Sequence, residues 1–148
     1  MAAMPWRDPR ARLASRMPVK TKRWDDPSED GDGLRVLICR YRPRGVRKEN
    51  ETWDIWAPDL GPSRALHAAR YGKNGEPIAW AEYEKRYLAE VKGAPTLARL
   101  LIRDLANRVR RGEHVTLLCS SACVDPTRCH RTLLSAMLEH EATSISAS

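Results

Sequence analysis

Residues 96–119 read TLARLLIRDLANRVRRGEHVTLLC and place a helical pattern directly ahead of a strand pattern. Apolar residues recur at the spacing of one helix face, at Leu97, Leu100, Leu101, Leu105 and Val109. Gly112 stands where the end of such a helix favours a left-handed residue. Residues 115–119 are then a short apolar run of the length of a buried strand. The stretch therefore predicts a helix over 96–111 and a strand over 115–119.

The same two patterns alternate along the rest of the chain. Strands are expected over residues 19–24 and 34–39, and helices over 63–71, 79–91 and about 128–141. Strands that alternate with helices are typical of a parallel sheet covered on both faces. We therefore expect a single α/β domain over residues 18–141, with three layers (α/β/α) and a mainly parallel central sheet of the Rossmann-like kind.

The positive charge of the chain is concentrated in its first residues. The net charge is +7, and residues 1–23 alone carry seven Lys or Arg against one Asp. Residues 1–17 are expected to form a flexible basic leader, which either holds nucleic acid or has no binding role. The sequence leaves open whether translation starts at Met1, Met4 or Met17. At the other end, residues 142–148 are small and polar and are expected to fray.

The composition favours a soluble, cytoplasmic protein. No apolar run is long enough to cross a membrane, and no apolar segment of a secretory signal follows the basic first residues. Of the four cysteines, three are crowded into one segment, which favours reactivity, metal binding or burial over a disulfide framework. We expect no membrane partner and no cofactor, and the oligomeric state does not follow from the sequence.

Residues 117–131, LLCSSACVDPTRCHR, form the clearest candidate site. They join an expected strand to an expected helix, and parallel sheets bind ligands beyond the carboxyl ends of their strands. The first amides of a helix have no partner within the helix, and their partial positive charge stabilises a thiolate or an anion. Cys129, His130 and Arg131 are therefore the catalytic candidates: a thiol of lowered pKa, a proton acceptor and a clamp for phosphate or carboxylate.

Other interpretations of this segment require particular residues at particular spacings. A tyrosine-phosphatase loop needs a Cys six residues ahead of Arg, and neither Arg128 nor Arg131 has one there, so this chemistry is excluded. A metal site would use Cys119, Cys123, Cys129 and His130, although their spacing is not one of the usual paired forms. The remaining alternative is a strand-to-helix turn without chemistry, in which Pro126 sets the bend.

A second basic segment, residues 40–48, follows the expected strand over 34–39. Pro43 and Gly45 make it a loop, and parallel strands would bring it to the same edge of the sheet as the cysteine segment. The residues expected to bind an anion there are Arg40, Arg42, Arg44, Gly45, Lys48 and Arg128. The alternative is that the loop is solvent-exposed and pairs with the acidic residues upstream, which are Asp25, Asp26, Glu29, Asp30 and Asp32.

Several segments together resemble a known family. They are RVLICRYRPRGVRK (35–48), EYEKRYLAE (82–90), VTLLC (115–119) and PTRCHR (126–131). Over about residues 17–141 the chain resembles the YeaO-like proteins of the domain-of-unknown-function family 488. The resemblance implies a compact bacterial α/β domain for which no reaction is established. It also implies that Cys39 and Ser121 stand where members often carry Asp and Glu, which counts against a mechanism that needs a carboxylate there.

One functional hypothesis leads and two alternatives stay open. The leading hypothesis is an enzyme or binding domain for a phosphorylated or nucleotide-like small molecule, held between the Cys-His-Arg end and the arginine loop. The large aromatic side chains would either stack a base or fill the core, and they are Trp53, Trp56, Trp80, Tyr41 and Tyr71. The first alternative is a nucleic-acid-binding module that uses the basic leader and the same loop. The second is a thiol redox or metal-linked regulator.

Overall fold

The computed structural model describes residues 19–73, 75–93 and 96–147. Its strands are β1 (Val19–Arg23), β2 (Leu34–Leu37), β3 (Ile55–Trp56) and β4 (Val115–Cys119). Its helices are α2 (Arg64–Arg70), α3 (Trp80–Lys92), α4 (Leu97–Arg110) and α5 (His130–Ala147). The basic leader expected over residues 1–17 lies outside the described residues. Within them, no helix is both long and apolar enough to cross a membrane.

The described strands form one parallel sheet in the order β1-β4-β2-β3. β4 is inserted between β1 and β2, so that Val115 pairs with Val19 on one side and with Leu34 on the other. Parallel strands need long crossover connections, and α2, α3 and α4 lie in the connection from β3 to β4. The prediction of a single α/β domain with a parallel sheet is confirmed, and the carboxyl ends of all four strands point to one edge.

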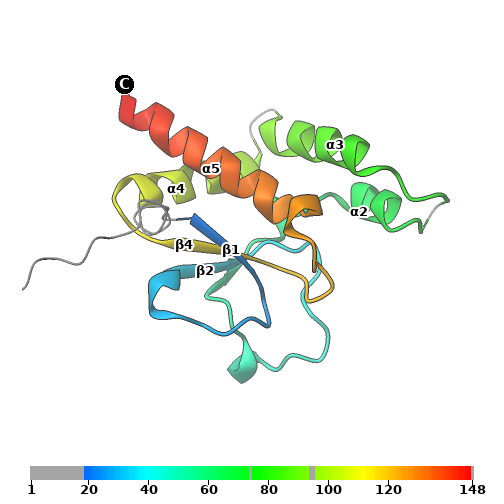
Figure 1. Ribbon diagram of the computed structural model, residues 1–148, viewed down its shortest axis with the longest axis horizontal. Coiled ribbons are helices and arrows are strands. Elements are labelled where there is room, and N and C mark those ends of the chain that lie inside the picture. Colours follow the sequence, from blue (N-terminus) through cyan, green and yellow to red (C-terminus); the bar gives the residue numbers. More distant parts are fainter. Residues whose placement is uncertain (1–18, 74, 94–95, 148) are drawn as a thin grey trace, which may run out of the picture.

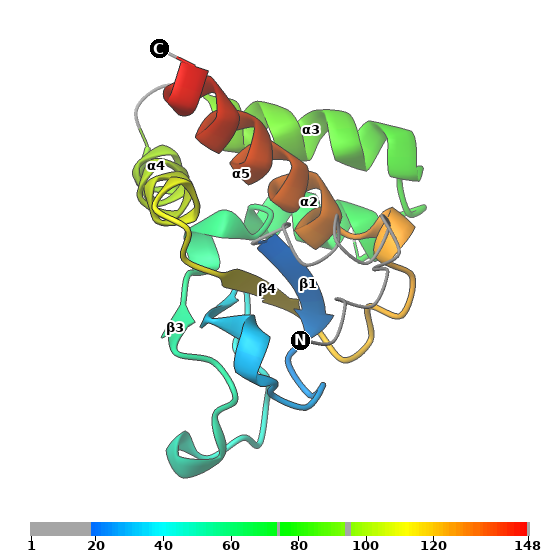
Figure 2. The same ribbon diagram turned by 60° about the vertical axis from the view of Figure 1, so that its left-hand side comes forward.

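The two faces of this sheet are covered differently (Figures 1 and 2). The helices lie together on one face, where Val36 and Leu117 join the main core. On the other face Leu37, Leu118 and Trp53 form a smaller core beneath loops and short 3₁₀ turns. The alternation of side chains along a strand separates these two sets. A second helical layer, which the sequence led us to expect, is replaced by loops, because the connections from β1 to β2 and from β2 to β3 contain no α-helix.

Helix α4 buries a different stripe from the one its leucines suggest. Its start is capped by Thr96, whose hydroxyl accepts a hydrogen bond from the amide of Arg99 at 3.2 Å. Leu97 and Leu100 follow the helical period, yet they are 56% and 63% exposed. The buried residues are Ala98, Ile102, Leu105, Ala106 and Val109. The helix therefore faces the core with a stripe that contains two alanines and leaves part of its leucine pattern in solvent.

Helix α5 is longer than its sequence suggests. It runs from His130 to Ala147 and so includes residues that were expected to fray. Ala142 is 6% exposed and belongs to the main core. Glu141 pairs with Arg99 of α4 at 3.0 Å. Packing against α4 thus continues the helix into a stretch whose small polar residues predict no helix by themselves.

A buried cluster of paired charges ties the loops to the strands. Asp32 is 1% exposed and lies in ion pairs with Arg35, Lys22 and Lys20, the last two at 2.9 and 3.5 Å. Burial alone would raise the pKa of Asp32. Hydrogen bonds from Lys22, the Glu29 amide and Arg35 outweigh burial and hold that pKa at about 2. The carboxylate is therefore ionised wherever the protein is folded at ordinary pH.

Candidate functional site

A cavity of about 540 Å³ opens at the carboxyl edge of the sheet. Its lining includes Cys39 and Arg40, which follow β2, and Cys119, where β4 ends. The loops that follow parallel strands meet at this edge, which is where such sheets bind ligands. The volume lies within the usual range for small-molecule sites. The structure thus brings the cysteine segment and the arginine loop together around one cavity.

Three thiols line the inner part of this cavity. The Sγ atoms of Cys119, Cys123 and Cys129 all lie within 4.8 Å of one another, and those of Cys119 and Cys129 are 3.3 Å apart. A tight turn brings the middle cysteine back toward the other two, since its amide donates to the carbonyl of Ser120 at 3.0 Å. Cys119 and Cys129 are buried, whereas Cys123 is half-buried. Cys123 is therefore the thiol of the three that a ligand in the cavity can approach.

Proton sharing within this thiol cluster favours a thiolate on Cys123. Hydrogen bonds from Cys119 and Cys129 lower the pKa of Cys123, and the positive charge of Arg131 lowers it further. The pKa of Cys129 is raised by its hydrogen bonds to the other two thiols and by burial, and the pKa of Cys119 is raised by its hydrogen bond to Cys123. The lowered pKa predicted for Cys129 is wrong, because its S–H is a buried donor.

His130 lines the cavity but is fixed by its surroundings. Its Nε2 lies 2.8 Å from the carbonyl oxygen of Ile38, and because a carbonyl only accepts, Nε2 carries the proton and donates. Nδ1 then presents its lone pair 3.9 Å from the Sγ of Cys119. Burial lowers the pKa of His130, and Tyr87 packs edge-on against the ring. His130 is thus a neutral, immobilised ring beside the thiols.

Arg131 lies outside the lining of the cavity. It is 6% exposed, and a terminal nitrogen donates to the carbonyl of Cys123 at 3.3 Å. Its buried Nε has no hydrogen-bond partner, and no carboxylate among the described residues forms an ion pair with it. This position conflicts with the predicted role of a clamp on a bound phosphate. Arg131 instead supports the turn that carries Cys123 and places a positive charge beside the thiols.

The rim of the cavity carries positive charge alone. Its cationic side chains are Arg40, Arg42, Arg44, Arg70, Lys73 and Arg128, and no Asp or Glu among residues 19–73, 75–93 and 96–147 belongs to the lining. Of the residues expected to bind an anion, Gly45 and Lys48 lie outside the lining. Among these six cations, the only ion pair within the described part of the chain joins Arg42 to Glu51, at 3.0 Å. The other five cations have no ion pair with a described residue, so the rim presents a concentration of positive charge.

The acidic residues upstream do not neutralise this rim. Glu29 and Asp32 pair with Lys22, and Asp25 and Asp26 pair with Arg23. The alternative in which these acids pair with the arginine loop is therefore wrong. They are held by strand β1, because its basic side chains lie nearer to the acidic loop.

Sequence reasoning missed the contribution of α2 to the cavity. Arg70 is the last residue of α2, its guanidinium donates to the carbonyl of Ile78 at 3.1 Å, and Lys73 follows in the next turn. The ring of His67 packs between those of Tyr41 and Tyr71, with centroid distances of 5.0 and 4.6 Å. No local sequence signal marks these residues, because α2 reaches the cavity through tertiary packing alone. Both tyrosine rings remain exposed, at 47% and 59%.

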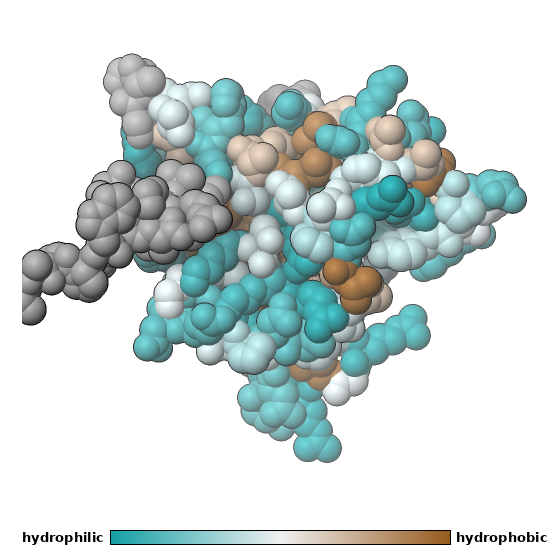
Figure 3. All heavy atoms as spheres, viewed as in Figure 1, coloured by the Kyte–Doolittle hydropathy of each residue, from teal (hydrophilic) through white to brown (hydrophobic). Residues whose placement is uncertain are grey.

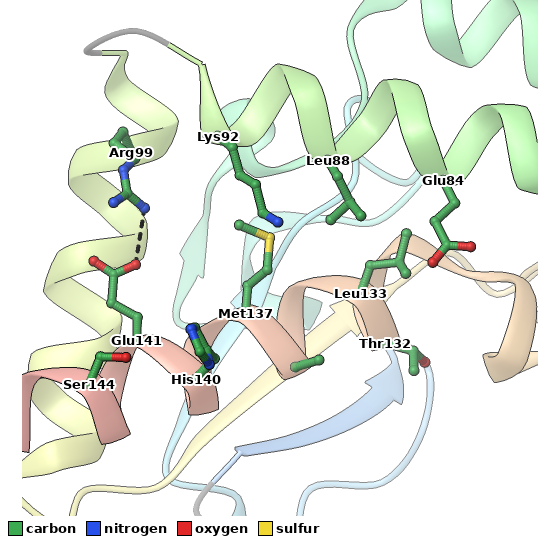
Figure 4. A pocket seen from close by; sticks show the side chains of 11 residues that line it. Glu84, Leu88, Lys92, Arg99, Thr132, Leu133, Met137, His140, Glu141 and Ser144 are labelled. Carbon is green, nitrogen blue, oxygen red and sulfur yellow. Dashed lines mark hydrogen bonds and ion pairs between the residues drawn. The ribbon is translucent and has the colours of Figure 1, made fainter. Parts of the chain in front are cut away.

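A second and larger cavity, of about 910 Å³, lies between α3 and α5 (Figure 4). Leu88, Leu133 and Met137 form its apolar surface. Its charged lining is mixed in sign and consists of Glu84, Glu141, Lys92 and Arg99, in addition to His140. On the face shown in Figure 3, hydrophobic residues occur in small groups among hydrophilic ones. We therefore take the smaller cavity, with its thiols and its single sign of charge, as the candidate site.

The chain is similar to known proteins over most of its described length. A family profile described as the active DUF488-N3 subclade matches residues 19–142. The uncharacterised protein YeaO of Escherichia coli is 37% identical over 75 residues, which cover 51% of this chain and 63% of YeaO, less than two thirds of its length. The uncharacterised protein Rv3073c of Mycobacterium tuberculosis is 33% identical over 90 residues, which cover 61% of this chain and 72% of that protein. No solved structure matches.

Proposed function

The chain belongs to the YeaO-like DUF488 family, and we propose that its cavity binds a phosphorylated or nucleotide-like small molecule beside the thiol cluster. One observation carries this proposal: six cationic side chains line the cavity, and no carboxylate from the described part of the chain does. Cations gathered in a concave site repel one another and attract anions. The planar fork of arginine suits the oxygens of a phosphate in particular.

Arg44 and Arg128 are the cations best able to hold such an anion. Both side chains are exposed, and neither makes a side-chain hydrogen bond or an ion pair with another described residue. The Nε of Arg40 is already engaged by the carbonyl of Pro62 at 2.7 Å, which fixes this guanidinium at the wall. We therefore assign direct phosphate contacts to Arg44 and Arg128, with Arg40 as a fixed charge beside them.

The aromatic wall favours a ligand that carries a ring. Tyr41 and Tyr71 line the cavity with exposed rings, and the His67 ring between them is held by both. A flat base stacks on such rings without regard to its identity. Cys123 is the thiol that a ligand in this position can approach, so it takes the reactive place that the sequence assigned to Cys129.

Calorimetric titration of the reduced full-length protein tests this proposal. AMP, ribose 5-phosphate, inorganic phosphate and adenosine separate the phosphate from the ring. We expect AMP to bind most tightly and adenosine to bind weakly or not at all. Arg44→Gln should weaken AMP binding at least about tenfold, since one charge-assisted hydrogen bond contributes roughly 1.5–3 kcal/mol. Arg103→Gln, an exposed arginine on α4 outside the cavity, is the matched control and should bind AMP like the wild type.

Two results would contradict the proposal. One is that none of the four compounds binds at millimolar concentration. The other is that Arg44→Gln and Arg103→Gln bind AMP equally well. The nucleic-acid alternative stays a prediction, because it depends on the leader. If removal of residues 1–16 leaves the affinity for RNA and DNA unchanged at low salt, the leader has no such role.

A further inference from the structure

The thiol cluster has the composition and compactness of a metal site. Its members are Cys119, Cys123 and Cys129, whose sulfur atoms all lie within 4.8 Å of one another. Within the described residues, no other group of three or more Cys, His, Asp or Glu side chains comes together in this way. Cysteine sulfurs are soft ligands, which select zinc, cadmium and monovalent copper over magnesium or calcium.

The spacing of the sulfurs fits a single ion. Zinc–sulfur bonds of about 2.3 Å at tetrahedral angles place two sulfurs about 3.8 Å apart. The Sγ atoms of Cys119 and Cys129 are 3.3 Å apart, and no pair in the cluster exceeds 4.8 Å. Adjustments of about 1 Å or less would therefore bring all three sulfurs to bonding distance of one ion. Cys123 lies in a surface turn, which makes such an adjustment easy.

The charge of Arg131 indicates which ion the cluster would hold. This guanidinium is buried, is not paired with any described carboxylate and lies against the turn of Cys123. A buried charge without a counter-charge costs several kcal/mol, so one negative charge beside Arg131, such as the thiolate of Cys123, is favoured. Three thiolates with a divalent ion carry one negative charge and balance Arg131. A monovalent ion would leave two negative charges, and a trivalent ion would leave none.

We propose that Cys119, Cys123 and Cys129 together bind one soft divalent metal ion of the zinc class. All three sulfurs bind as thiolates, so the thiols that still carry protons release them as the ion binds. The backbone amide of Arg131, in the first turn of α5, donates a hydrogen bond to the sulfur of Cys129 and supports it as a ligand.

The fourth coordination position faces the cavity. His130 lies beside the cluster but outside the set of mutually close ligand atoms, and its ring is held by the carbonyl of Ile38. All three cysteines line the cavity, so the side of the ion away from the protein is open to it. Three protein ligands and one open position are typical of catalytic zinc, whereas structural zinc has four protein ligands. The bound ion would therefore be available to water or to a ligand atom.

Metal binding by the reduced, untagged full-length protein tests the proposal without any organic ligand. Equilibrium dialysis against micromolar Zn²⁺ should leave one ion per chain, and Cd²⁺ titration should give thiolate-to-cadmium absorption that saturates at one equivalent. Loss of a group that only hydrogen-bonds to a metal ligand can weaken metal binding roughly 100-fold. Cys123→Ser removes a ligand itself, so it should weaken binding at least that much. Cys39→Ser is the matched control, because Cys39 lines the same cavity outside the cluster, and it should bind like the wild type.

A measurement on the wild-type protein tests the proposal even if a variant fails to fold. Bound Zn²⁺ should protect Cys123 from alkylation, as read by peptide mass spectrometry, and a chelator should restore its reactivity. The proposal is overturned if the wild type binds less than one ion per chain at micromolar concentration. It is also overturned if Cys39→Ser loses as much affinity as Cys123→Ser, or if Zn²⁺ leaves the alkylation of Cys123 unchanged. None of these outcomes depends on AMP binding, so the two proposals fail separately.

Discussion

Two clusters of charged side chains in this molecule are built in opposite ways. Around Asp32, a buried carboxylate is matched by Arg35, Lys22 and Lys20, and every charge has a partner. Around the cavity, six cations gather, and none of the described residues adds a carboxylate to the lining. Paired charges hold loops to strands, whereas unpaired like charges lower the stability of the fold. The comparison teaches that the first cluster serves the structure, whereas the second has no such role, and we propose that it serves binding.

The largest expected effect comes from breaking the paired cluster. Asp32→Asn removes the negative charge, leaves the buried Arg35 without a counter-charge and leaves Lys22 with Glu29 as its ion-pair partner. Breaking a buried ion pair in this way costs about 3–5 kcal/mol. We expect a loss of that size in the free energy of unfolding, measured by urea denaturation. Asp104→Asn is the control, since the exposed pair of Asp104 with Arg108 should contribute only about 0.5 kcal/mol. Equal losses in both variants would mean that the Asp32 cluster is not a structural anchor.

The next effect concerns the reactivity of Cys123, which lines the same cavity as the six cations. Its pKa is lowered, so its thiolate persists below the pH at which ordinary thiols are protonated. Between pH 8 and pH 6 the thiolate of an ordinary thiol falls roughly 100-fold, whereas the alkylation rate of Cys123 should change little. Metal-free protein treated with iodoacetamide and mapped by mass spectrometry measures this. If the rate falls 100-fold, or if Cys129 is modified first, the assignment of the thiolate to Cys123 is wrong.

Acid should weaken the paired cluster by a smaller amount. The folded pKa of Asp32 is about 2 and its ordinary value is 3.8, so the folded protein holds this proton less tightly than the unfolded chain. The stabilisation is therefore fully present above about pH 4 and is lost as the pH falls toward 2, by roughly 2 kcal/mol. Urea denaturation at pH 5 and pH 2.5 should show a larger loss in the wild type than in Asp32→Asn. Equal losses would mean that the titration belongs to other groups.

The sequence predicted the elements of the fold well, because these depend on local patterns. The strand over residues 115–119 and the helix expected over residues 96–111 are both present in the structure. The meeting of two distant loops at one edge follows from parallel strands alone. The buried stripe of α4 could not be predicted, because Leu97 and Leu100 fit the helical period but lie beyond the reach of the neighbouring elements.

The chemistry of the site was harder to predict, because it depends on where side chains point and which groups donate hydrogen bonds, and neither follows from the sequence alone. Cys129, His130 and Arg131 are consecutive, yet Arg131 turns away from the cavity that the other two line. The order of the thiol pKa values depends on which S–H donates to which sulfur, and this is set by the turn between Ser120 and Cys123. Arg70 reaches the cavity from a helix whose position follows from packing alone.

The smallest expected effect comes from comparing an arginine of the charged rim with an arginine of the larger cavity between α3 and α5. Arg128→Gln removes one of several like charges, so the free energy of unfolding should stay unchanged or rise by up to about 0.5 kcal/mol. Arg99→Gln leaves the Glu141 carboxylate, whose side chain is 16% exposed, without its partner and should lower stability by about 0.5–1 kcal/mol. Urea denaturation at low salt measures both, and high salt should shrink the difference. A loss of stability in Arg128→Gln equal to that in Arg99→Gln would mean that the rim is held by compensating contacts. The contrast between paired and unpaired charge would then no longer distinguish a binding site from a structural one.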